Sequence, residues 1–75
     1  MTDEDNLLKS RLEALDSRVV EKLQKIKYTE GWAERKKKGH EIRMLILSAV
    51  GHIEAGRKSE LQTKLEELDS LGVKY

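Results

Sequence analysis

The sequence predicts an all-α protein, on three observations: apolar residues recur at helical spacing, proline is absent, and 39% of the 75 residues are charged. Most of the charged residues are Glu, Lys and Arg, which favour helices and carry long solvated side chains. Aromatic residues are rare, so the core must be aliphatic. We expect one domain over residues 1–75, a helical hairpin or three-helix protomer with a long first helix, which assembles into an oligomeric helical bundle.

A first helix is expected over about residues 3–28. Thr2 and Asp5 approximate a capping box, and the acidic residues of the first turn suit the positive end of the helix dipole. Apolar residues then follow one face at spacings of three and four. They are Leu8, Leu12, Leu15, Val19, Leu23 and Ile26. This narrow apolar stripe needs a partner helix.

The end of this helix has two interpretations. Either Tyr28–Gly31 forms a turn in which Thr29 caps a second helix, or the break lies at Gly39, and a single bent helix is a third possibility. We favour the turn near Gly31, because Trp32, Gly39 and Ile42 then share one face with the apolar residues that follow. Gly39 would lie on the apolar stripe, where its missing side chain lets another helix approach.

The second helix is expected over about residues 30–55, and its second half is the most apolar part of the chain. One face carries Ile42, Leu45, Ile46, Ala49, Val50 and Ile53, whereas Met44 and Leu47 point elsewhere. A helix that is apolar on more than one side is contacted on more than one side, so we expect this one to be central.

A third helix is expected over about residues 59–71. Gly56 suits a left-handed cap at the end of the second helix, and Ser59 with Gln62 resembles a capping box. Gly72 would end the third helix, with Val73 folded back in a Schellman motif. The inward-facing residues are Leu61, Leu65 and Leu68.

Oligomerisation follows from the small size of the chain. A core of fewer than about 70–80 residues seldom supplies more than ~3–5 kcal/mol without a disulfide, a metal or a partner subunit. The sequence has no cysteine, and two histidines alone do not make a zinc site. We therefore expect a homo-oligomer, with a dimer favoured. Its expected interface is Leu8, Leu12, Leu15, Val19, Leu23, Ile26, Ile42, Leu45, Ile46, Ala49 and Ile53.

The uneven distribution of charge leaves a nucleic-acid alternative open. The formal net charge is +1, but residues 19–43 carry eight basic and four acidic side chains. Phosphate contacts would use Arg35, Lys36, Lys37, Lys38 and Arg43, with Trp32 and Tyr28 near enough to stack on bases. However, four consecutive helical residues point in four directions, and we favour a solvated basic surface.

No catalytic, cofactor-binding or metal-binding motif is evident. His52 and Glu54 do not face each other on a helix, and His40 and His52 lie about 120° apart around it. The arginines flank the apolar stripes rather than interrupting them, and no serine has a base at a suitable spacing. Trp32 is interpreted as an anchor over the hairpin end, with an interface hot spot as the alternative. We expect no enzyme, no cofactor and no metal.

The chain is expected to work in the cytoplasm without contacting a membrane. Its longest predominantly apolar run, 44–50, is too short to span a bilayer, and the acidic start lacks the order of a signal peptide. The leading hypothesis is a non-enzymatic protein–protein interaction module, an adaptor or regulator of another protein. The alternative is a small dimeric regulator of DNA or RNA.

One further pattern covers about a third of the chain and consists of Glu41, Ile42, Leu45, Ala49, Val50, Ile53 and Gly56. It resembles a helix-to-hairpin segment of translin-type RNA-binding proteins. Any amphipathic hairpin would share these residues, so the resemblance assigns no family and only adds to the nucleic-acid alternative.

Overall fold

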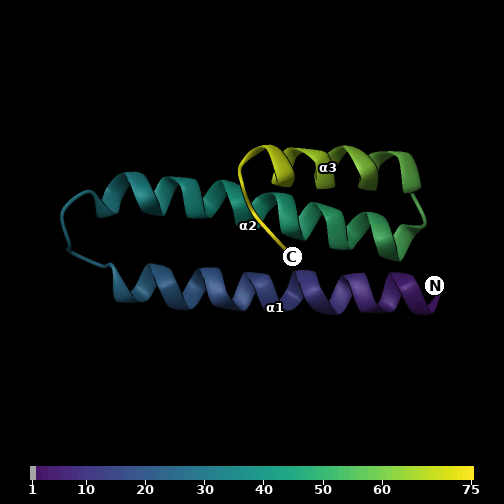
Figure 1. The fold of residues 1–75 in the computed structure, drawn as a ribbon, viewed down its shortest axis with the longest axis horizontal. Helices are drawn as coiled ribbons and strands as arrows, with labels where there is room; N and C mark the ends of the chain where they lie inside the picture. Colours follow the sequence, from purple (N-terminus) through teal and green to yellow (C-terminus); the bar gives the residue numbers. More distant parts are fainter. Residues whose placement is uncertain (1) are drawn as a thin grey trace.

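Three helices make up the fold, as shown by a computed structural model that describes residues 2–75. They are α1 (Asp3–Lys25), α2 (Trp32–Ala55) and α3 (Lys58–Ser70). The molecule is elongated, 42 Å long and 17–18 Å across. Figure 1 shows α2 between the other two helices, and α2 packs against both. The prediction of an all-α fold is confirmed, and so is the central place of the second helix.

α1 begins as its sequence predicts. The Thr2 hydroxyl accepts a hydrogen bond from the Asp5 amide at 3.1 Å, and the Asp5 carboxylate accepts one from the Thr2 amide at 3.4 Å. This capping box satisfies amide groups that have no partner within the helix. α1 ends at Lys25, three residues before the expected boundary, and Gly39 lies inside α2. The break is therefore near Gly31.

Thr29 does not cap α2, contrary to the prediction. Tyr28 has a left-handed backbone with φ of 66°, which turns Thr29 back over the end of α1. There both the hydroxyl and the amide of Thr29 donate to the Ile26 carbonyl. The cap of α2 is Gly31, whose φ is 74° and which offers no side chain. Thr29 thus completes the preceding helix instead of starting the next one.

A Schellman motif ends α2 and sets the start of α3. The Arg57 amide donates to the His52 carbonyl at 2.9 Å, and the amide of Gly56, with φ of 73°, donates to Ile53 at 3.2 Å. α3 follows at Lys58, so Ser59 already lies within the helix. The predicted capping box of Ser59 and Gln62 is therefore wrong. The Ser59 carbonyl instead accepts from the Thr63 hydroxyl at 3.2 Å.

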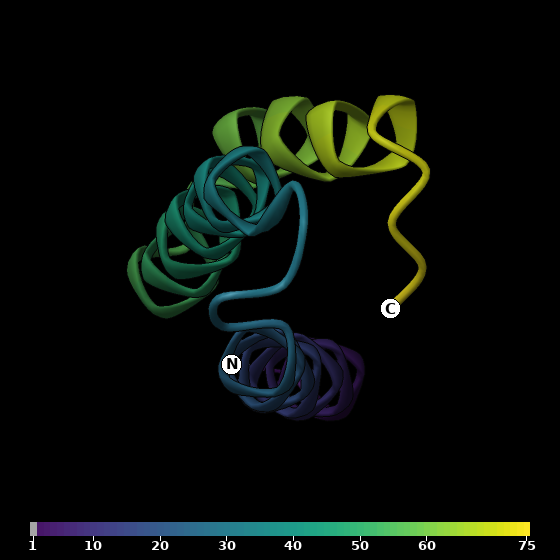
Figure 2. The ribbon, with the colours of Figure 1, turned by 90° about the vertical axis from the view of Figure 1, so that its left-hand side faces the viewer.

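The predicted Schellman motif at the end of α3 is confirmed. The amide of Gly72, with φ of 76°, donates to the Asp69 carbonyl at 2.9 Å, and the Val73 amide donates to Leu68 at 3.1 Å. This turn brings Val73 against the core. Figure 2 shows the chain after α3 descending towards α1.

The core is small and includes side chains from every helix. Its buried residues are Leu12 and Leu15 of α1, Ile46, Ala49 and Ile53 of α2, and Leu68 of α3. Partly buried residues surround them: Leu8, Val19, Ile42, Leu45, Val50, Leu61, Leu65 and Val73. At about 25 cal/mol per Å² of apolar surface, full burial of one Leu, Ile or Val side chain contributes about 1.5–3 kcal/mol.

α3 covers only part of α2. It has 13 residues against 24 in α2, which at 1.5 Å per residue is about 20 Å against about 36 Å. The residue that caps α3, Leu71, lies beside Met44 and Leu45 near the middle of α2. The first half of α2 consequently has α1 on one side and no third helix, as Figure 1 shows.

Candidate interaction surfaces

Most of the residues expected at an oligomer interface lie within the single chain. Five of the eleven belong to its buried core, namely Leu12, Leu15, Ile46, Ala49 and Ile53. Four more pack against that core: Leu8, Val19, Ile42 and Leu45. In this fold the five core residues are buried against other helices of the same chain, whereas the four that pack around them remain partly exposed. Leu23 and Ile26 remain half-buried beside an open groove.

This groove runs between α1 and α2 at the end of the molecule that carries their connecting loop. It has a volume of about 500 Å³. Its apolar lining comes from both helices and from the chain after α3: Leu15, Val19, Leu23, Ile26, Ile42 and Val73. We call it the α1–α2 groove.

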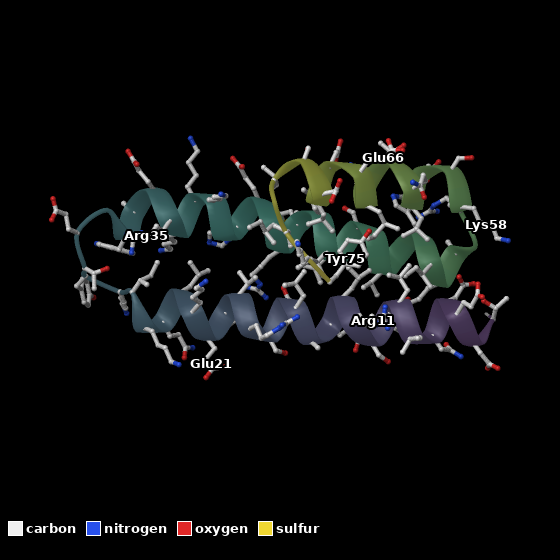
Figure 3. The ribbon with its side chains drawn as sticks, in the orientation of Figure 1. Arg11, Glu21, Arg35, Lys58, Glu66 and Tyr75 are labelled. Atoms are coloured by element: carbon white, nitrogen blue, oxygen red, sulfur yellow. The ribbon has the colours of Figure 1, made fainter. Side chains whose placement is uncertain are left out.

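Four basic residues surround the apolar floor of the α1–α2 groove. Lys22 comes from α1, Arg35 and Lys38 from α2, and Lys74 from the C-terminal segment, and no acidic residue is among the lining residues. None of the four forms an ion pair with another residue of 2–75. Figure 3 shows Arg35 on the side of α2 that faces α1. The groove therefore combines apolar surface with unneutralised positive charge.

Gly39 explains how closely the two helices approach beside the groove. A Cβ atom at this position would lie 2.8 Å from Cδ2 and 2.9 Å from Cδ1 of Leu23. The Leu23 side chain of α1 thus occupies the space that a side chain of α2 would fill. The prediction that Gly39 permits close approach of another helix is confirmed.

A smaller hollow, of about 230 Å³, lies between the same two helices on another side. It is lined by Val20, Leu23, Gln24, Lys27, Trp32, Lys36, His40 and Arg43. Trp32 packs edge-to-face on Tyr28 with ring centroids 5.6 Å apart, and the Lys36 ammonium lies 5.3 Å from the Trp32 centroid. This position agrees with the interpretation of Trp32 as an anchor at the hairpin end.

The structure divides the predicted nucleic-acid contacts among three surfaces. Arg35 and Lys38 line the α1–α2 groove, Lys36 and Arg43 line the smaller hollow, and Lys37 lies beside Met44 on a third surface. Arg43 is also held by Asp16, with its Nε 2.8 Å and its Nη2 3.5 Å from the two carboxylate oxygens. The hydrogen bond and charge of Asp16 raise the pKa of Arg43 above its usual value. The five basic residues therefore line three different hollows, and Arg43 is already paired with Asp16.

The histidines lie in separate places. His52, near the turn between α2 and α3, has its Nδ1 3.0 Å from Arg57 Nε and 3.2 Å from a Glu60 carboxylate oxygen, whereas His40 lines the smaller hollow. Within residues 2–75 no three His, Asp or Glu side chains come together as metal ligands. No helix in that part of the chain is long and apolar enough to cross a membrane.

We call the four basic residues around the α1–α2 groove, Lys22, Arg35, Lys38 and Lys74, its basic rim. The sequence analysis missed Lys22 and Lys74. Lys22 could have been found, because it lies three residues after Val19 and four before Ile26, at the edge of the α1 stripe. Lys74 could not, because its place depends on the fold-back of the chain after α3.

Comparisons of the chain with known protein families, with curated proteins and with solved structures found no match.

Proposed function

We propose that this protein is a non-enzymatic protein–protein interaction module, a small homo-oligomeric helical-bundle adaptor or regulator that works in the cytoplasm. A dimer is the favoured oligomer. The observation that carries the proposal is apolar surface on α2 that neither α1 nor α3 covers. Met44 is 63% exposed and Leu47 is 53% exposed, although both belong to the central helix.

The outward face of α2, formed by His40, Met44, Leu47 and Gly51, suits a second copy of the same helix. These residues recur at spacings of four, three and four, and a Cβ atom on Gly51 would meet nothing within 4 Å. In an antiparallel pair with its two-fold axis between Leu45 and Ile46, Met44 would meet Leu47 of the second copy. His40 would meet the small Gly51. The face is thus complementary to itself, as a two-fold interface requires.

Sedimentation velocity at low micromolar concentration tests the proposal. We expect a dimer, and we expect Met44→Glu to give a monomer with unchanged helical content by circular dichroism, because a charge would be buried in the contact. The matched control is Leu7→Glu, which alters an apolar side chain of similar exposure (54%) on α1. A wild-type protein that is monomeric at every concentration would overturn the proposal, and so would a dimer that persists in Met44→Glu.

The nucleic-acid alternative has less support, because its five basic residues lie on three surfaces and Arg43 is paired with Asp16. Addition of a 20-base-pair DNA duplex or of an RNA hairpin should leave the sedimentation coefficient unchanged at about 0.15 M salt. A complex lost on neutralisation of Lys36, Lys37 and Lys38 would favour the alternative instead.

A further inference from the structure

The α1–α2 groove lies in the half of the molecule where α1 and α2 pack together without a third helix. The end of α3 lies beside Met44 and Leu45, so the first eleven residues of α2, 32–42, extend past it. Eleven helical residues span about 16 Å, or three turns. Figure 1 shows that α3 does not reach this half of the molecule. A short helix laid in the groove would contact both α1 and α2 there.

The lining of the groove specifies the chemistry of such a helix. A helix with one apolar stripe would bury it on Val19, Leu23, Ile26 and Ile42. Lys22 stands on the α1 side of this floor, and Arg35 and Lys38 stand on the α2 side. Carboxylates on both flanks of the apolar stripe would therefore meet unpaired cations, whereas basic flanks would be repelled.

We propose that the α1–α2 groove binds an acidic amphipathic helix, about three turns long, from another protein. This inference rests on the proposed function as an interaction module and names the partner class of one surface. It is independent of the outward face of α2, which is assigned to a second copy.

A second copy of the chain is a poor occupant of the groove. The acidic helix α3 has its apolar residues, Leu61, Leu65 and Leu68, packed in its own core. The acidic first turns of α1 continue into Leu8 and Leu12, which are packed there too. Each acidic helix thus has its apolar stripe occupied within the fold, and a different protein must supply a free one.

The experiment uses a synthetic 14-residue peptide as the probe. It carries leucine at alternating spacings of three and four, glutamate on both sides of the leucines, and alanine elsewhere. A matched peptide has lysine in place of glutamate. Fluorescence anisotropy at about 50 mM salt should show saturable binding of the glutamate peptide and at least about tenfold weaker binding of the lysine peptide. The amide resonances of Leu23, Gly39 and Val73 should shift on binding.

Rim variants locate the site. Arg35→Glu combined with Lys38→Glu should weaken binding of the glutamate peptide by about tenfold or more, because two attractive contacts become repulsive. The control is Lys37→Glu, a single charge reversal one residue from Lys38 on another surface, which should alter the affinity by less than about twofold, whereas Lys38→Glu alone should weaken binding by more than that. All three positions are exposed, so the fold should survive each change.

Three outcomes would overturn the inference: equal binding of both peptides, equal effects of the rim and control variants, or displacement of the bound peptide by phosphatidylglycerol vesicles, which would indicate a lipid surface. Failure of the proposed self-association is separately visible. Met44→Glu should bind the glutamate peptide with wild-type affinity, and the variant with both rim changes should sediment like the wild type.

Discussion

Lys9 connects the start of α1 to the end of α2, and this contact should make stability depend on pH. Its ammonium lies 3.0 Å from a Glu54 carboxylate oxygen and 3.9 Å from one of Glu13. The hydrogen bond and charge of Glu54 raise the pKa of Lys9 above its usual 10.5. A pKa that is higher in the folded state contributes stability fully below the unfolded value and loses it as the pH rises through the folded value.

We therefore expect Lys9→Met to lower the urea midpoint at about pH 8 and to match the wild type more closely at about pH 11.5. The control is Lys58→Met, which makes the same change at a lysine that forms no ion pair within residues 2–75 and should alter the urea midpoint at about pH 8 less than Lys9→Met does. A Lys9 effect that persisted undiminished at high pH would show that packing of the side-chain stem, and not its charge, stabilises the fold.

Gly39 and Leu23 should be energetically coupled. An Ala at position 39 gains about 0.5–1 kcal/mol of helix stability over Gly, but its Cβ forces the Leu23 methyl groups to move. These methyl groups end a flexible, half-buried side chain, so we expect Gly39→Ala to be within about 1 kcal/mol of the wild type. In a Leu23→Ala background the clash is gone, and the same change should stabilise by about 0.5–1 kcal/mol.

Urea unfolding of the four proteins in this double-mutant cycle measures the coupling. Gly39→Leu supplies a stronger test, because the extra volume should destabilise by about 1–3 kcal/mol. Tolerance of Leu at position 39 would mean that α1 and α2 lie farther apart than the groove geometry requires.

At the scale of the helices, the sequence predicts motifs that are complete within a few residues. The box of Thr2 and Asp5, the left-handed Gly56 and the fold-back of Val73 each depend on at most six consecutive positions. The predictions that Thr29 and Ser59 cap the second and third helices are wrong, because the position of a cap also depends on where the preceding helix stops. α1 stops early at Lys25, and the turn at Gly56 is tight enough that α3 starts before Ser59.

Substitution by alanine should have opposite effects at two glycines that end helices and at one that lies inside α2. Gly56 and Gly72 adopt left-handed conformations, which cost a residue with a Cβ about 1–2 kcal/mol. Gly51 lies inside α2 with open space around its Cβ position, where Ala should stabilise the monomer by about 0.5–1 kcal/mol. Thermal unfolding should therefore show lower midpoints for Gly56→Ala and Gly72→Ala and, where dimerisation does not contribute, a higher one for Gly51→Ala. A lower midpoint for Gly51→Ala only at high protein concentration would indicate that this position packs against a second copy.

At the scale of the molecule, the apolar stripes predicted that surfaces are buried but not which surfaces meet. The stripe of α1 was expected to face a second chain, and in the fold it faces α2. Periodicity alone cannot separate these two cases, because a helix buries the same residues against either partner. The α1–α2 groove could not be predicted from the sequence either. Its shape depends on the length of α3 relative to α2 and on the path of Val73 and Lys74.

The small core makes the stability of the whole fold sensitive to single buried side chains. Leu12 is 0% exposed among residues of all three helices, so Leu12→Ala should cost about 2–5 kcal/mol. That is comparable to the ~3–5 kcal/mol that a single core of this size supplies, and the variant should be largely unfolded as a monomer at 25 °C. Leu7→Ala makes the same change on α1 at a position that is 54% exposed and should shift the free energy of unfolding by less than about 0.5 kcal/mol. Circular dichroism at 222 nm during urea unfolding compares the two variants, and equal effects would mean that α1 does not pack on α2 in this register.

Because binding stabilises the folded state, the glutamate peptide should restore helical signal to Leu12→Ala if the groove is its site.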